Sequence, residues 1–110
     1  KILLLGLTFK ENCPDVRNTK VIDIIKELSD YGCKVDVFDP WVDRGEALTS
    51  MGLEVLEDIE KGIYSAIIVS VAHTAFQEMS SKQIRSYGLK NSILYDLKSL
   101  FPSNESDLRS

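Results

Sequence analysis

The sequence has few of the residues that build metal centres and disulfide frameworks. Its 110 residues contain two cysteines, Cys13 and Cys33, and one histidine, His73. The two cysteines lack the paired spacing of zinc ligands. We therefore expect no metal site, and we expect both thiols to be reduced, as in a cytoplasmic protein.

Long apolar runs and an excess of basic residues are also missing. No run approaches the roughly 20 apolar residues that span a bilayer, and no signal peptide is visible, so we expect no membrane association. The net charge of −4 and the pI of about 4.9 argue against nucleic-acid binding, which needs a basic face. The chain begins directly with strand residues and without methionine, and we expect it to be part of a longer protein.

What the sequence does contain is the composition of an ordinary globular protein, with 44% hydrophobic and 27% charged residues. Its length suits one domain with a substantial core. We expect residues 1–102 to form that domain and residues 103–110 to form a polar C-terminal tail.

Segments with strand character alternate with segments of helix character. Continuous apolar runs and β-branched stretches predict strands over residues 2–5, 35–38, 53–56, 66–71 and 92–96. Apolar spacing and glycine terminators predict helical segments from residue 18 to Gly32 and over residues 42–51, 58–62 and 76–87. This alternation predicts an α/β fold, a Rossmann-like three-layer sandwich with a mostly parallel sheet of about five to six strands.

In such a sheet, ligands bind outside the carboxyl ends of the strands. The predicted strand ends carry residues 6–10, 39–41, 72–74 and 96–98. The first twenty residues contain four basic and two acidic side chains in an otherwise acidic chain, so we expect an anion site there. The first junction has no G-x-G-x-x-G or P-loop pattern, and a phosphate bound there would be neutralised by side-chain charge.

Three residues of the first junction have two interpretations each. Lys10 either neutralises a phosphate or is solvated on a loop. Arg17 either forks onto phosphate oxygens or pairs with Asp15 at the surface. Phe9 either stacks on a base or sugar or fills the core.

The later strand ends suggest structural roles. Asp39 stands where a standard Rossmann domain keeps a ribose-binding carboxylate, but without the glycine fingerprint we interpret it as an Asp-Pro turn residue. His73 could act as a general base, although a structural, hydrogen-bonded histidine is the favoured interpretation. We interpret Trp41 as packing at the rim. Cys13 lies among cations, which favour a thiolate, but no second cysteine or histidine is close in sequence, so we expect no catalytic role for it.

The pattern of residues 6–19, Gly-Leu-Thr-Phe-Lys-Glu-Asn-Cys-Pro-Asp-Val-Arg-Asn-Thr, resembles the opening motif of the C-terminal domain of the UDP-glucose/GDP-mannose dehydrogenases. The resemblance continues in order through residues 35–40, 66–73 and 95–98. The Asn-Cys-Pro-Asp form of residues 12–15 is most similar to the branch that oxidises UDP-N-acetylhexosamines for bacterial capsule or O-antigen synthesis.

The resemblance implies a function for the chain. It would be the UDP-sugar-binding domain of an NAD-dependent 6-dehydrogenase, which oxidises the sugar C6 alcohol to a carboxylate with two NAD. The family's NAD-binding domain, its dimerisation region and its catalytic cysteine and lysine would lie outside this chain. The chain alone is therefore expected to be inactive, and the intact enzyme is expected to be a homodimer or larger.

The resemblance also assigns roles to individual residues. Phe9 and Lys10 correspond to positions that contact the UDP-sugar, and Arg17 to an arginine that reaches toward the NAD pyrophosphate. Lys98 corresponds to a substrate-binding cation that is often arginine, and a lysine there lacks the bidentate geometry.

A second interpretation from another class is a non-catalytic signalling module such as a receiver domain. That fold needs paired acids after its first strand and a phosphorylatable aspartate after its third. Here the first strand ends in Gly6 and Leu7, Asp39 follows the second strand, and Lys98 alone fits.

Overall fold

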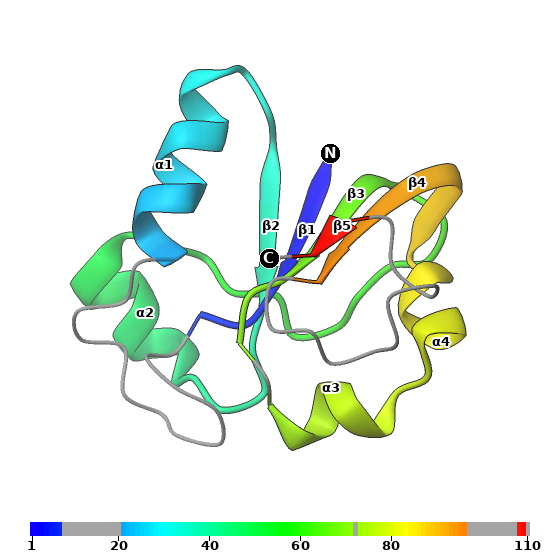
Figure 1. Ribbon diagram of the computed structural model, residues 1–110. Helices are drawn as coiled ribbons and strands as arrows, with labels where there is room; N and C mark the ends of the chain where they lie inside the picture. The colour runs from blue at the N-terminus through cyan, green and yellow to red at the C-terminus, as the bar shows by residue number, and fades with distance from the viewer. Residues whose placement is uncertain (8–20, 72, 97–107, 110) are drawn as a thin grey trace.

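The computed structural model describes residues 1–7, 21–71, 73–96 and 108–109, and in these residues the chain forms one five-stranded parallel sheet flanked by helices (Figure 1). The strands lie in the order β2-β1-β3-β4-β5. Their bounds are β1 Ile2–Leu5, β2 Val35–Phe38, β3 Tyr64–Val69, β4 Gly88–Asp96 and β5 Leu108–Arg109. The helices are α1 Val21–Asp30, α2 Arg44–Met51, α3 Thr74–Glu78 and α4 Ser81–Arg85.

Strand β1 is an inner strand of the sheet, because it pairs with β2 on one side and β3 on the other. Successive side chains of a strand point to opposite faces. Leu3 and Leu5 accordingly pack into a cluster with Phe76 of α3 and Ile84 of α4. Leu4 packs into a second cluster on the other face. The apolar run of β1 is therefore buried on both faces, as predicted.

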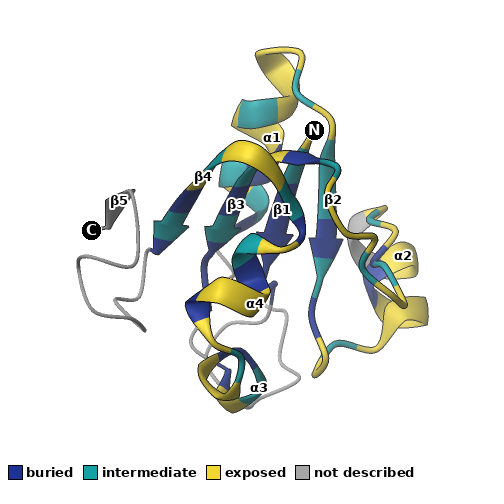
Figure 2. Cartoon of the chain, turned by 90° about the vertical axis from the view of Figure 1, so that its right-hand side faces the viewer, coloured by how far each residue is buried: buried dark blue, intermediate teal, exposed yellow. Residues whose placement is uncertain are grey.

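The second cluster lies under α1 and α2. Its buried members are Leu4, Leu7, Val21, Ile25, Val37, Ala47, Val55 and Val71. Figure 2 shows the molecule from the side of the other cluster, with α3 and α4 in front of the sheet and α1 and α2 behind it. The two helical layers with the sheet between them confirm the predicted three-layer, Rossmann-like sandwich.

The predicted strand at residues 53–56 is wrong. The structure has a single bridge there, between Val55 and Val37 of β2, and the Leu56 N–H donates to the Val37 carbonyl at 2.8 Å. Val55 is the buried residue of this segment, because Glu54 and the acidic residues after Leu56 favour water. Val55 lies beside β2, which is an edge strand of the sheet. A Rossmann sheet has its third strand in this place, and here that strand is reduced to a single bridge.

Three further boundaries differ from the sequence prediction. Residues 58–62 form bends and a turn instead of a helical turn. Gly88, predicted as a helix terminator, begins β4, although regular pairing with β3 starts only at Ile93. Leu108 and Arg109, placed in the predicted tail, pair with Tyr95 and Asp96 as β5. None of the helices in the described part of the chain is long and apolar enough to cross a membrane.

Candidate functional site

The strand order places the candidate site at the carboxyl ends of β1 and β3. These strands are neighbours, yet the chain leaves β1 toward α1 on one face and leaves β3 toward α3 on the other (Figures 1 and 2). Such a point, where the strand order reverses, is where open α/β sheets bind ligands. The described residues that border it are Gly6, Leu7, Asp39, Trp41, Ser70 and His73.

Gly6 and Ser70 hold the ends of β1 and β3 close together. The Ser70 Oγ donates to the carbonyl oxygens of Leu5 at 3.1 Å and Gly6 at 2.7 Å. Gly6 has φ +105°, and a Cβ added to it would lie 2.6 Å from the Cβ of Val71. Glycine is needed here both for its backbone conformation and for this close approach.

Asp39 joins three segments through its buried carboxylate. Its Oδ2 accepts from the Leu7 N–H at 2.7 Å and lies 2.9 Å from Nε2 of His73, and its Oδ1 accepts from the Trp41 N–H at 2.7 Å. Backbone N–H groups therefore donate to both oxygens of Asp39, and the His73 ring is a third partner of the same side chain. The bond to Trp41 confirms the interpretation of Asp39 as a turn residue.

His73 lies at the start of α3, and its ring is fully buried. The ring packs against Phe76, with 5.4 Å between centroids, and lies 6.4 Å from the ring of Trp41. This environment confirms the interpretation of His73 as a structural, hydrogen-bonded histidine. Trp41 is 44% exposed, so it is less buried than rim packing predicted.

The residues predicted to contact substrate and cofactor, Phe9, Lys10, Arg17 and Lys98, lie outside the described residues, as does Cys13. The strands that precede them are described. Lys10 follows β1 and Lys98 follows β4, and β3 lies between these two strands. The two lysines therefore follow strands that are not neighbours in the sheet.

The described residues do not fit a dinucleotide or a metal ion. Both oxygens of Asp39 are used within the fold, so this carboxylate does not serve a ribose. The first junction has no glycine fingerprint to cradle a pyrophosphate. Within the described ranges, no three His, Cys, Asp or Glu side chains form a group that could hold a metal ion.

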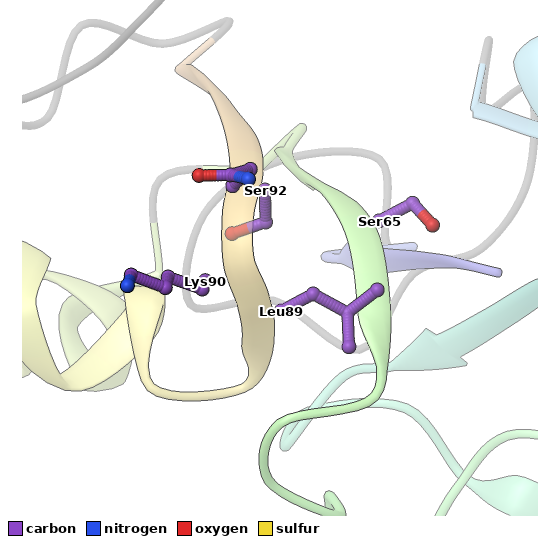
Figure 3. Close-up of a pocket in the computed structure, with 5 residues that line it drawn as sticks. Ser65, Leu89, Lys90 and Ser92 are labelled. Atoms are coloured by element: carbon purple, nitrogen blue, oxygen red, sulfur yellow. The ribbon is translucent and has the colours of Figure 1, made fainter.

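A pocket of about 400 Å³ lies at the amino ends of β3 and β4 (Figure 3). It is lined by Ser65 near the start of β3 and by Leu89, Lys90, Asn91 and Ser92 near the start of β4. Because these are the amino ends of the strands, the pocket is separate from the candidate site at their carboxyl ends.

Residues 3–103 match the protein-family model described as the UDP-glucose/GDP-mannose dehydrogenase family, UDP binding domain. The chain belongs to this family. It is 50% identical over 108 residues to the UDP-N-acetyl-D-glucosamine 6-dehydrogenase of Salmonella typhi, covering 98% of this chain and 25% of that protein. It is also 50% identical over 109 residues to the enzyme of the same name from Pseudomonas aeruginosa, covering 99% and 26%.

Solved structures support the fold of this family domain. The chain superposes on the UDP-N-acetyl-mannosamine dehydrogenase Cap5O from Staphylococcus aureus with a TM-score of 0.71 at 23% identity, covering 94% of this chain and 23% of that one. This chain spans about a quarter of the length of the curated relatives it matches. The resemblance read from the motifs is confirmed, and the receiver-like alternative is not favoured.

Proposed function

We propose that the chain is the nucleotide-sugar-binding domain of an NAD-dependent UDP-sugar 6-dehydrogenase. The observation that carries the proposal is the match of residues 3–103 to the UDP-binding domain of the family. Residues 1–102 form most of the proposed domain, and Leu108–Arg109 add β5 to its sheet. The carboxyl ends of β1 and β3 are the position expected for the ligand.

The proposed reaction of the intact enzyme is the oxidation of a C6 alcohol to a uronate. The substrate is a UDP-hexose or UDP-N-acetylhexosamine. The reaction takes place in the cytoplasm, and its product is a building block for surface polysaccharide. Support for the N-acetylated branch comes from the names of the relatives at 50% identity. NAD is bound mainly by a domain outside this chain, and the intact enzyme is a homodimer or larger.

The task of this chain is to hold the nucleotide and its diphosphate. Lys10 and Lys98 supply positive charge to the diphosphate and sugar, and Phe9 supplies an aromatic surface. A diphosphate in a water-poor cleft needs such charge-assisted contacts. Arg17 reaches toward the NAD pyrophosphate, and its forked guanidinium suits that group. The catalytic residues lie outside the chain, so it is inactive alone.

The proposal is tested by assaying the full-length protein with NAD. The candidate substrates are UDP-glucose, UDP-GlcNAc, UDP-GalNAc, UDP-ManNAc and GDP-mannose. We expect NADH formation with at least one UDP-sugar, at two NADH for each sugar. An enzyme that reduces NAD with none of the four UDP-sugars would contradict the proposal.

A further inference from the structure

The Asp39–His73 pair connects the ends of three strands at the candidate site. Leu7 lies two residues after β1, Asp39 directly after β2, and His73 four residues after β3. The side chains of both members of the pair are completely buried. The pair is therefore the point through which these three strand ends are held in one arrangement.

One oxygen of Asp39 carries most of this coupling. Oδ2 accepts from the Leu7 N–H at 2.7 Å and from Nε2 of His73 at 2.9 Å. Because the two donors share one atom, the position of the His73 ring determines where Oδ2 holds the Leu7 amide. The ring is itself held by packing against Phe76 in the first turn of α3.

The other oxygen of Asp39 extends the coupling to the main chain of Trp41. Oδ1 accepts from the Trp41 backbone N–H at 2.7 Å. Trp41 is 44% exposed, and its ring lies 6.4 Å from the His73 ring. A buried carboxylate is thus bonded to the backbone of a half-exposed residue that follows β2.

Stability alone does not require such a pair. Burying polar, ionisable side chains costs desolvation free energy, and well-packed apolar residues of similar volume often stabilise a fold as well or better. The pair nevertheless lies at the carboxyl edge of the sheet, beside the switch point. This location is more readily explained by a requirement for a fixed geometry at the binding edge.

We propose that His73 is a positioning residue for nucleotide-sugar binding. Acting through Asp39, it holds the main-chain amides of Leu7 and Trp41 at the carboxyl ends of the strands, where the UDP-sugar is proposed to bind. The proposal rests on the proposed function.

The test compares His73→Gln with His73→Asn in the full-length enzyme. The amide nitrogen of glutamine reaches about as far as Nε2 of histidine and can donate to Oδ2, whereas that of asparagine cannot. We expect the KM for the UDP-sugar to rise about tenfold or more in His73→Asn, because Asp39 then loses its hydrogen bond to residue 73. It stays within about threefold of the wild type in His73→Gln, and kcat changes little in both.

Tyr64→Phe is the matched control. It removes a side-chain hydrogen bond between the same two strands, the 2.8 Å bond from the Tyr64 hydroxyl to Asp36, at the amino edge. We expect Tyr64→Phe to lower stability without changing the KM. Each variant is assayed well below its own Tm, which removes effects of unfolding.

The outcomes separate the inference from the function on which it rests. Rescue by glutamine and not by asparagine, with kcat preserved, supports the positioning role. Equal KM values for the two His73 variants in an active enzyme would overturn the inference and leave the proposed function in place. A wild-type protein that oxidises no UDP-sugar would overturn both.

Discussion

Two polar side chains, the carboxylate of Asp39 and the hydroxyl of Ser70, connect the carboxyl ends of the strands to one another. Asp39 holds Leu7, Trp41 and His73, and Ser70 bonds the carbonyls of Leu5 and Gly6. These contacts use polar groups that would cost free energy if they were buried without partners. The same groups that stabilise the fold therefore also fix the edge at which a nucleotide is proposed to bind.

The first prediction at this scale concerns Lys10. If Lys10 neutralises the substrate diphosphate, Lys10→Ala in the full-length enzyme loses most of the turnover. Lys90→Ala is the matched control, because Lys90 is exposed beside the pocket at the opposite edge of the sheet (Figure 3). Steady-state kinetics with NAD and the preferred UDP-sugar give the comparison. Wild-type kinetics in Lys10→Ala would remove this residue from the site.

A second prediction concerns Gly6. Gly6→Ala should lower the free energy of unfolding by about 3 kcal/mol or more, because it combines a strained φ with a Cβ placed 2.6 Å from Val71. Gly32→Ala is the control, since Gly32 has φ +84° and no atom within 4 Å of an added Cβ. Strain alone should cost about 1 kcal/mol there. Equal losses in urea denaturation would show that the contact with Val71 is unimportant.

At the scale of elements, the apolar runs were sufficient to predict the central strands. Ile2–Leu5 and most of Tyr64–Val69 are covered by helices on both faces, and such strands are apolar nearly throughout, with the exposed Ser65 as the exception. The prediction of a strand at residues 53–56 was wrong because an alternating pattern does not show how many residues of a segment pair with a neighbouring strand. In the structure only Val55 pairs, through a single bridge. The pairing of Leu108 and Arg109 with β4 has no local sequence signal.

Strands β2 and β3 are also joined at their amino ends by the hydrogen bond from Tyr64 to Asp36. Burial raises the pKa of the Tyr64 hydroxyl above its ordinary value of about 10, and the hydrogen bond to Asp36 and the charges of Asp36 and Glu60 raise it further. Above about pH 10 the unfolded chain loses this proton while the folded chain keeps it. The contribution of Tyr64 to stability is therefore complete below about pH 10 and declines as the pH rises further.

Tyr64→Phe tests this sign. The variant should be about 1 kcal/mol less stable than the wild type near neutral pH, because it lacks the hydrogen bond. The difference should shrink as the pH rises past about 10, because phenylalanine has no proton to lose. Urea denaturation of both proteins between about pH 8 and about pH 11 measures it, and the other titrating groups cancel in the comparison. A difference that stays constant with pH would contradict the raised pKa.

At the scale of the whole molecule, the sequence predicted the three layers of the fold. It did not predict that Asp39 and His73 would meet. They are 34 positions apart, and their contact depends on the register of β2, β1 and β3 together. Each also had a sufficient local explanation, a turn for Asp39 and a polar strand end for His73. Long-range polar pairs of this kind follow from topology and not from local pattern.

The central claim is that UDP binds at the carboxyl edge of this chain. The most direct measurement is a titration of the ¹⁵N-labelled 110-residue chain with UDP, followed by amide and indole chemical shifts, with ADP as the matched nucleotide. The account predicts saturable shifts at Leu7, Trp41 and His73, stronger with UDP than with ADP, and none at Lys90 or Asn91. The absence of saturable shifts, or shifts confined to the pocket of Leu89–Ser92, would contradict it.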